Sequence, residues 1–294
     1  MQRLLADRVA IVTGAARGLG RTHALALARH GAKVLVNDLD AAAAESVCAD
    51  IAHLGGEALT DCADVRDAAA VEVMVAATLG RWGRVDILVN NAGILRDRTF
   101  AKLDLADFRL VLEVHLMGSV NCTRAVWPHM KEHRYGRVVL TTSSSGLYGN
   151  FGQTAYSAAK MALVGLMQTL ALEGERYDIR VNCLAPSAAT QMTDELWTPE
   201  DGAMLDPRHV SPAVVALASE GAPNKCILLA GGGSFKLAHI TMTRGIHVAD
   251  DEQAAERILR EWSAIADRSG EIVPAKGFEQ YQFELATARK SGLA

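Results

Sequence analysis

Apolar and polar positions divide most of the chain into short strand-like runs separated by longer helix-like segments. Seven runs rich in Val, Ile and Leu predict strands, at residues 9–13, 33–38, a third ending at 64–65, 85–90, 137–142, 179–183 and 227–230. Most are continuously apolar, which is typical of parallel strands buried on both faces. Strands that alternate with helices predict an α/β fold, so we expect a doubly wound, parallel, seven-stranded sheet with helices on both faces.

The helix-like segments carry recognisable ends. The first follows a glycine-rich turn and stops before Gly31, and another starts after the capping residue Asp67. Residues 104–133 predict two helices. Pro128 inside the second predicts a kink or a nearby end, because proline has no backbone N–H to donate.

The pattern changes after the seventh predicted strand. Residues 1–235 predict one domain, whereas residues 236–294 lack the strand–helix alternation. They offer two amphipathic helical segments instead, at 250–267 and 280–288. We therefore expect a C-terminal helical extension that packs on the main domain.

Composition is that of an ordinary globular protein, with 50% hydrophobic residues, 22% charged residues and a net charge of −4. No basic block occurs, so no nucleic-acid partner is expected. The 5 cysteines are an odd number without a CxxC pair, which favours free thiols in a reducing compartment over disulfides or a metal site. The first strand starts too early for a secretory signal, and no run of about 18 apolar residues predicts a membrane span. We expect a cytoplasmic protein without a bound metal.

A glycine-rich turn joins the first predicted strand to the first helix, with the sequence Thr13-Gly14-Ala15-Ala16-Arg17-Gly18-Leu19-Gly20. Small residues let the backbone approach a pyrophosphate, and the helix N-terminus adds amide donors and a positive dipole. The flanking strand and helix distinguish such a motif from a plain tight turn. We expect a Rossmann-like dinucleotide site that is contacted by Gly14, Arg17, Gly18, Leu19 and Gly20.

Asp38 ends the second predicted strand. A carboxylate there accepts hydrogen bonds from the ribose hydroxyls of NAD and repels the additional phosphate of NADP. Arg17 argues the other way, because a basic residue in the turn attracts that phosphate. We give Asp38 more weight and expect NAD, with NADP the less favoured cofactor. The alternative for Asp38 is a solvated turn carboxylate or a helix cap.

Two further groups follow strands, at the edge where α/β sheets bind ligands. Asp64 and Val65 follow the third strand, and Asp64 is expected to accept a hydrogen bond from the adenine amino group. Asn91, Ala92 and Gly93 follow the fourth strand and are expected to line the adenosine.

Tyr156 and Lys160 stand one turn apart near the start of a long helix predicted for 154–177, and Ser143 follows the fifth strand. Together they suit proton exchange with an alcohol or ketone while a nicotinamide exchanges hydride with it. Ser143 would hold the substrate oxygen, and Lys160 would also contact the nicotinamide ribose. We expect the Lys160 ammonium and the oxidised nicotinamide to favour the phenolate of Tyr156. A YxxxK spacing alone is also common on helix surfaces.

As a set, these motifs closely resemble the short-chain dehydrogenase/reductase family. The matching features are the TGxxxGxG turn at 13–20, Asp38, NNAG at 90–93, Ser143, and Tyr156 with Lys160. The resemblance covers about 230 of the 294 residues. It implies a nicotinamide-dependent oxidoreductase that interconverts a secondary alcohol and a ketone. It also implies a homodimer or homotetramer that forms through the helices of 104–133 and 154–177.

Three segments point to a narrower subgroup: NNAGILRDRTF (90–100), VHLMGS (114–119) and SSSGLYGNFGQTAYSAAK (143–160). They resemble the dehydrogenase module of peroxisomal multifunctional enzyme type 2, also known as type 4 17β-hydroxysteroid dehydrogenase. That resemblance implies NAD-dependent oxidation of (3R)-hydroxyacyl-CoA and some activity on steroids. No hydratase or sterol-carrier module follows, so we expect an enzyme similar to the stand-alone bacterial relatives.

Two positions depart from the general family pattern. His115 stands where the family has an asparagine whose backbone carbonyl holds a water beside the lysine. It is expected either to serve that proton relay or to be a packed helix histidine. Pro186-Ser187 replaces the usual Pro-Gly, and the resemblance places Pro186 at the cofactor. The following segment, 187–215, is expected to cover the substrate with the apolar side chains of Met192, Leu196, Trp197 and Met204.

The leading hypothesis is an NAD-dependent (3R)-hydroxyacyl-CoA dehydrogenase with a hydrophobic small-molecule substrate. The alternatives are a hydroxysteroid or other secondary-alcohol dehydrogenase, and an NADPH-dependent 3-oxoacyl thioester reductase. A non-catalytic nucleotide-sensing protein is disfavoured by the intact serine, tyrosine and lysine. Arg96, Arg98 and Lys102 are the nearest basic candidates for the phosphates of CoA, or equally solvated loop charges.

Overall fold

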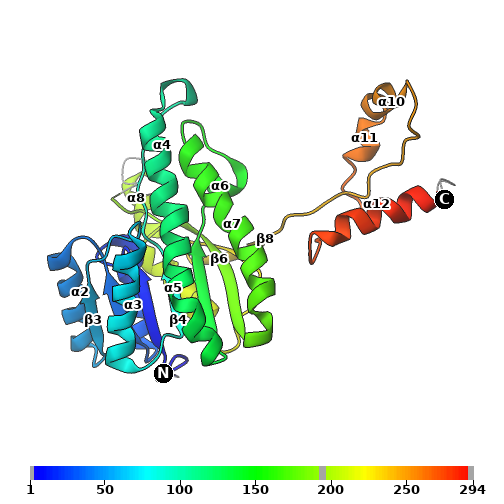
Figure 1. The fold of residues 1–294 in the computed structure, drawn as a ribbon. Helices are drawn as coiled ribbons and strands as arrows, with labels where there is room; N and C mark the ends of the chain where they lie inside the picture. The colour runs from blue at the N-terminus through cyan, green and yellow to red at the C-terminus, as the bar shows by residue number, and fades with distance from the viewer. Residues whose placement is uncertain (1–2, 192–196, 291–294) are drawn as a thin grey trace. The chain divides into compact units, whose positions relative to one another are not determined.

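The computed structural model describes residues 3–191 and 197–290. Within this part of the chain, eight strands form one sheet in the order β3-β2-β1-β4-β5-β6-β7-β8 (Figure 1). The strands are β1 (Val9–Thr13), β2 (Lys33–Asn37), β3 (Ala58–Asp61), β4 (Ile87–Asn90), β5 (Gly136–Thr141), β6 (Ile179–Ser187), β7 (Ile227–Gly231) and β8 (Ser234–Ala238). All pairs from β3 to β7 are parallel. The predicted doubly wound parallel sheet is confirmed.

The edge strand β8 is one more strand than the seven predicted. It follows β7 after Gly232 and Gly233, whose φ angles are +55° and +74°. Consecutive residues with positive φ form the tight turn of a hairpin, and so short a connection joins antiparallel strands only. β8 was not predicted, and the domain boundary predicted at 235 falls inside this strand.

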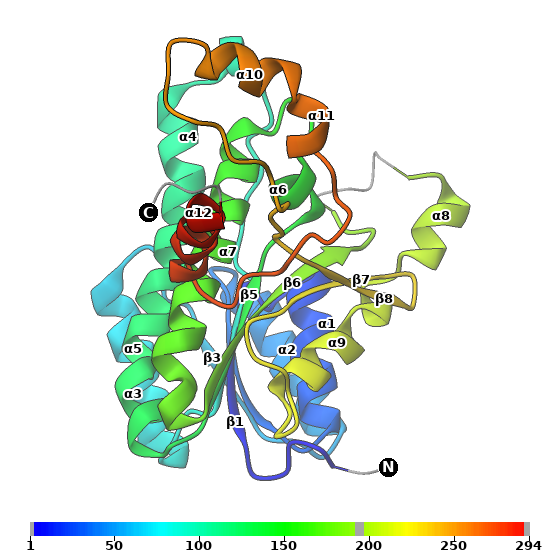
Figure 2. The same cartoon turned by 90° about the vertical axis from the view of Figure 1, so that its right-hand side faces the viewer.

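Helices cover both faces of the sheet (Figure 2). One face carries α1 (Gly18–Arg29), α2 (Ala41–His53) and α9 (Ser211–Ala218), and the other carries α3 (Ala68–Trp82), α5 (Gly118–Glu132) and α7 (Thr154–Gly174). The predicted cap Asp67 accepts hydrogen bonds from the first-turn amides of α3. Two short helices, α6 (Ser144–Tyr148) and α8 (Pro199–Met204), were not predicted.

Among the described residues, one helical segment, Thr154–Tyr177, has the length and composition to cross a membrane. In the fold, α7 instead packs on β5 and β6 and against α4 (Leu105–Leu112) and α6. Ala159, Leu163 and Val164 are among its buried residues. These contacts are those of a core helix in a sheet domain.

The segment predicted as two helices is one continuous helical run. α4 passes through a π-helical turn at Glu113–Met117 directly into α5. Pro128 lies inside α5, which ends one turn later at Glu132, close to the proline as predicted. A π turn is rare and often lies at a functional site. This one carries His115.

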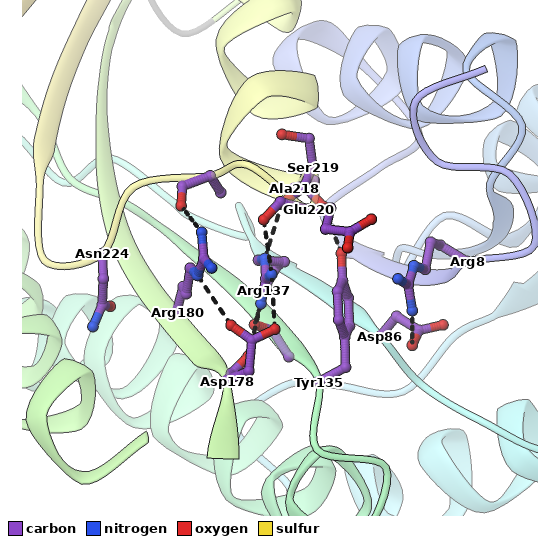
Figure 3. Close-up of polar contacts among 12 residues, drawn as sticks. Arg8, Asp86, Tyr135, Arg137, Asp178, Arg180, Ala218, Ser219, Glu220 and Asn224 are labelled. Atoms are coloured by element: carbon purple, nitrogen blue, oxygen red, sulfur yellow. Dashed lines mark hydrogen bonds and ion pairs between the residues drawn. The ribbon is translucent and has the colours of Figure 1, made fainter. Parts of the chain in front are cut away.

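A polar network ties together the amino ends of β4, β5 and β6 (Figure 3). Arg137 is fully buried there. Its guanidinium donates to the Asp178 carboxylate and to the carbonyl oxygens of Gly136, Asp178, Ser219 and Glu220. The ring of Tyr135 lies between Arg137 and Arg8, whose guanidinium carbons are 4.1 and 3.5 Å from the ring centroid. The network fixes the edge of the sheet opposite the carboxyl ends of the strands.

The chain divides into two compact units, one up to Leu237 and one from Ala238 onward. The helices of the second unit are α10 (Ala254–Arg260), α11 (Trp262–Ile265) and α12 (Phe278–Lys290). The single helix predicted for 250–267 is thus two short helices. The helical extension is present, and its packing on the main domain stays a prediction.

Candidate active site

The glycine turn has no room for side chains at two positions. Gly14 has φ +61°, and a Cβ added at Gly20 would lie 2.0 Å from the carbonyl oxygen of Gly14. The N-cap residue of α1, Arg17, gives no side-chain hydrogen bond to its helix, whereas α2 and α3 begin at capping aspartates. The first-turn amides of α1 are therefore left for an anion, and the turn fits a pyrophosphate.

A cleft of about 300 Å³ opens at the carboxyl ends of β1 to β4. The predicted cofactor residues that line it are Gly14, Asp38, Asp64, Val65, Ala92 and Gly93. The predicted cofactor residues of the turn and strands that do not line it are Arg17, Gly18, Leu19, Gly20, Asn91 and Pro186. The predicted cofactor set did not include the other lining residues, namely Asn37, Leu39, Ala63, Arg66, Ile94, Arg96, Leu110 and Val114. Of these, Ile94, Arg96 and Val114 lie in the segments that resemble the narrower subgroup, and the rest belong to no motif.

The Asp38 carboxylate is held against the glycine turn. It accepts hydrogen bonds from the backbone amides of Ala16 at 3.0 Å and Asp40 at 3.1 Å. Arg17 was expected to oppose Asp38 by attracting the additional phosphate of NADP. Its guanidinium forms an ion pair with the side chain of Asp40 instead. The basic residue of the turn is thus neutralised, while Asp38 lines the cleft.

Two predicted cofactor contacts are engaged within the protein. Arg66 binds the Asp64 carboxylate through Nε at 2.9 Å and Nη2 at 2.5 Å. These hydrogen bonds lower the pKa of Asp64 below its usual value. Asn91 donates from Nδ2 to the carbonyl oxygens of Thr13 and Gly14, at 3.0 and 2.9 Å. Asn91 therefore joins β4 to the glycine turn, and Asp64 is occupied by an arginine that no motif indicated.

The helix α7 and the end of β5 bring the predicted catalytic residues together. The Lys160 ammonium is buried, donates to the Thr141 carbonyl at 2.5 Å and lies 5.5 Å from the centroid of the Tyr156 ring. A side-chain hydrogen bond joins Tyr156 to Ser143. Ser143 is itself fixed, since its Oγ accepts from the Ser145 amide at 3.2 Å.

Burial controls the protonation of this site. Desolvation lowers the pKa of Lys160 to about 7. Desolvation also raises the pKa of Tyr156, against the opposing effect of the hydrogen bond to Ser143, and the charge of Asp97 raises it further. Without a cofactor, burial therefore favours the neutral phenol of Tyr156, and the phenolate expected beside Lys160 and an oxidised nicotinamide stays a prediction. Motif spacing contains no measure of burial, which penalises the charged forms of both side chains.

His115 lies in the π turn, and its ring is packed rather than solvated. Nε2 is 3.1 Å from the amide nitrogen and 2.8 Å from the carbonyl oxygen of Ile94. The ring stands edge-on to Tyr156, with centroids 5.3 Å apart. Burial, and then the charge of Lys160, lower the pKa of His115 to about 3, so the ring is neutral. The His115 carbonyl, which the family resemblance assigns to a water, accepts from Ser119 Oγ at 2.7 Å.

The family model for short chain dehydrogenases matches residues 8–201, which contain the glycine turn, the cleft and the Ser143–Tyr156–Lys160 group. The chain belongs to the short-chain dehydrogenase family. It is thus an oxidoreductase, and members of this family use nicotinamide cofactors.

Three known proteins place this dehydrogenase within the family. A short-chain type dehydrogenase/reductase of Mycobacterium tuberculosis is 43% identical over 274 residues, which are 90% of this chain and 96% of that protein. Peroxisomal multifunctional enzyme type 2 of Drosophila melanogaster is 43% identical over 289 residues, which are 92% of this chain and 48% of the longer enzyme. Its full-length structure has a TM-score of 0.83 at 37% identity and matches 97% of this chain and 50% of its own. This dehydrogenase therefore spans about half the length of the multifunctional enzyme.

A third relative is known with its ligands. The structure of 7α-hydroxysteroid dehydrogenase complexed with NADH and 7-oxo glycochenodeoxycholic acid has a TM-score of 0.73 at 30% identity. It matches 79% of this dehydrogenase and 96% of its own chain.

The segment 187–215, which was predicted to cover the substrate of this dehydrogenase, is described except for residues 192–196. Pro186 lies in β6, paired in register with Ala230 of β7. Trp197 and Met204 are exposed, at 36% and 54% of their surfaces. Met192 and Leu196 lie outside the described residues. All 5 cysteines are free, and within residues 3–191 and 197–290 no three His, Cys, Asp or Glu side chains gather as metal ligands.

Proposed function

We propose that this dehydrogenase oxidises (3R)-hydroxyacyl-CoA to 3-oxoacyl-CoA with NAD. The observation that carries the proposal is the match to peroxisomal multifunctional enzyme type 2, which extends over 92% of the chain and so beyond the nucleotide-binding half. A CoA thioester carries phosphates and an apolar acyl chain. The phosphates suit the exposed arginines of the loop after β4, and the acyl chain suits the apolar residues of the segment before α9.

Each residue of the site has a role in this reaction. NAD, when bound, supplies the hydride acceptor. Ser143 holds the substrate oxygen, and Tyr156 takes the hydroxyl proton in its phenolate form, which the charges of Lys160 and of bound oxidised NAD would favour against the effect of burial. Lys160, with a pKa of about 7, exchanges a proton with its surroundings near neutral pH. The neutral ring of His115 holds Tyr156 in place by edge-on packing.

NAD is favoured over NADP by the charges around the cleft. Asp38 lines it with a carboxylate fixed by two backbone amides. The nearest basic side chain of the glycine turn, Arg17, is paired with Asp40. An additional phosphate on the ribose would therefore meet a negative charge without a free cation beside it.

The test measures NADH formation by purified protein from (3R)-hydroxyacyl-CoAs of short, medium and long chain length. The (3S) isomers are the matched control, and NADP replaces NAD in a parallel series. We expect turnover of the (3R) isomers only, with NAD preferred at least about tenfold. A Tyr156→Phe variant should lose turnover yet still bind NADH. Absence of turnover with every medium and long (3R) thioester refutes the proposal.

A hydroxysteroid dehydrogenase is the second candidate. The structural match to 7α-hydroxysteroid dehydrogenase with its oxo bile acid favours it. The same assay decides between the two, because a panel of 3-, 7- and 17-hydroxysteroids joins the thioesters. Steroid turnover far above that of any thioester would show that the enzyme is a hydroxysteroid dehydrogenase. The proposed roles of Ser143, Tyr156 and Lys160 would be unchanged.

A further inference from the structure

Two exposed loops are joined beside the proposed proton acceptor Tyr156. One follows β4 and contains Asp97 and Arg98, and the other is the turn before α7 that contains Gly152 and Gln153. The Arg98 amide donates to the Gly152 carbonyl at 2.9 Å, and Arg98 pairs with Gln153 in a short parallel bridge. The Gln153 amide nitrogen donates to the Asp97 carboxylate at 2.7 Å.

From this contact, hydrogen bonds continue inward to the site. Gln153 Oε1 accepts from the Asn150 side chain at 3.3 Å. Asn150 Nδ2 also donates to Ser145 Oγ at 3.1 Å, and the Ser145 amide donates to Ser143 Oγ at 3.2 Å. An unbroken series of contacts therefore leads from the exposed Asp97 to the buried hydroxyl of Ser143.

The same loop is tied to Tyr156 at its other end. Ile94, which lines the cofactor cleft, contacts His115, and the His115 ring packs edge-on against Tyr156. Gln153 is the N-cap residue of α7, one turn before Tyr156. The segment 94–98 is thus held at both ends by elements that hold the tyrosine.

We propose that Asp97 and Gln153 are positioning residues that lock the loop after β4 onto the first turn of α7 and so hold Ser143 and Tyr156 in register with the cofactor cleft. This inference deepens the proposed function and rests on the proposed role of Tyr156. An exposed hydrogen bond contributes little to stability. A displacement of reacting groups by about 1 Å, however, lowers a rate by up to about 100-fold.

The test exchanges the donor and the acceptor in the hydrogen bond between Gln153 and Asp97. Gln153→Glu places two carboxylates together and breaks the lock. Asp97→Asn alone keeps an acceptor for Gln153, and the double variant D97N/Q153E restores one donor and one acceptor. Asp50→Asn is the matched control, because Asp50 is a surface carboxylate on α2 that pairs with Arg21 outside both loops and this series of contacts.

We expect Gln153→Glu to lower kcat about tenfold with KM changed less than about threefold, and the double variant to recover most of kcat. All variants should keep the melting temperature within about 2 °C, because the contact is exposed. A wild-type kcat in Gln153→Glu, or a folded double variant that recovers nothing, overturns the inference.

The pH dependence supplies a readout that a purely structural contact would not move. The groups that face Tyr156 are Lys160 on α7, His115 in the π turn, Ser143 after β5 and Asp97 in the loop. Removing the Asp97 charge lowers the pKa of Tyr156, so the rise of the oxidation rate in Asp97→Asn should move to lower pH. The Asp50→Asn profile should match the wild type, and an unmoved Asp97→Asn profile contradicts the inference.

Hydrogen exchange separates this inference from the proposed function. Amides of residues 94–99 and 149–153 should exchange faster in Gln153→Glu and return to wild-type rates in the double variant. That measurement needs no substrate. If the wild type oxidises no thioester, the proposed function fails, and the lock is still judged by exchange and by whichever alcohol the enzyme does oxidise. Unchanged exchange in both loops of Gln153→Glu refutes the lock itself.

Discussion

Replacing Arg137 by methionine should destabilise the protein severely without touching the active site. The guanidinium is fully buried and makes 5 hydrogen bonds, of which 4 go to carbonyl oxygens. Methionine fills most of the volume but leaves these carbonyls without their donor. Arg137 lies at the amino end of β5, so the cofactor cleft at the opposite edge of the sheet should be unaffected.

The loss of unfolding free energy in Arg137→Met depends on which of the hydrogen bonds of Arg137 contribute most to stability. The Asp178 carboxylate is 42% exposed and also pairs with Arg180, so its ion pair with Arg137 contributes little after solvent screening. Hydrogen bonds from a buried charged donor contribute about 1.5–3 kcal/mol each, and less where the acceptor carbonyl also reaches solvent, as at Glu220. One side chain makes all of them, so they do not add fully. We expect a loss of about 3–5 kcal/mol of unfolding free energy, a large part of a typical total of about 5–15 kcal/mol.

Urea unfolding followed by circular dichroism measures this loss as a lower midpoint at unchanged slope. Thermal unfolding should show a melting temperature lower by about 10 °C. Arg180→Met is the matched control, because Arg180 is 33% exposed and bonds to the Ala222 carbonyl and Asp178; its loss should be about 1 kcal/mol. If Arg137→Met loses no more than Arg180→Met, water satisfies the carbonyls and the reasoning is refuted.

Three further predictions concern the site. Burial lowers the pKa of Lys160 from 10.5 to about 7, so between these pH values the unfolded chain binds more protons and stability rises with pH. The melting temperature of Lys160→Met relative to the wild type should therefore be highest at or below pH 7 and fall toward pH 10, and a difference that does not change between these pH values contradicts this. Asp38→Ala should raise the efficiency with NADP relative to NAD at least about tenfold, and an unchanged ratio of kcat/KM would show that Asp38 does not discriminate. Gly20→Ala should abolish NADH binding measured by fluorescence, because its Cβ would lie 2.0 Å from the Gly14 oxygen, whereas Gly80→Ala, with open space around it, should not.

The presence of seven of the strands and their parallel direction could be predicted, because buried parallel strands leave continuous apolar runs. Their ends could not. β3 ends at Asp61 rather than at 64–65, and β6 continues through Pro186 to Ser187. Both ends are set by pairing with neighbouring strands, such as Pro186 with Ala230, and a proline within a strand reads as a break in the sequence.

Motif spacing predicted which side chains gather but not how each is engaged. Ser143, Tyr156 and Lys160 meet, and Asp38 lines the cleft. The pairing of Arg17 with Asp40 depends on the side-chain conformations of two exposed residues, which no spacing rule contains. Burial, which determines the protonation of Tyr156 and Lys160, likewise depends on elements distant in the sequence.

The π turn that carries His115 also sets the rotational phase of everything after it. Each residue of an α-helix advances the chain by about 100° around the helix axis. Beyond the turn, Asn121 donates to the Val65 carbonyl at 2.9 Å, and Thr123 accepts from Asn90 at 3.2 Å. Removing one residue from 113–117 would swing both away from the strand ends they hold. The number of residues in the π turn therefore fixes both the place of His115 beside Tyr156 and the rotation of α5 on the sheet. An insertion or a deletion in this turn would disturb the two together.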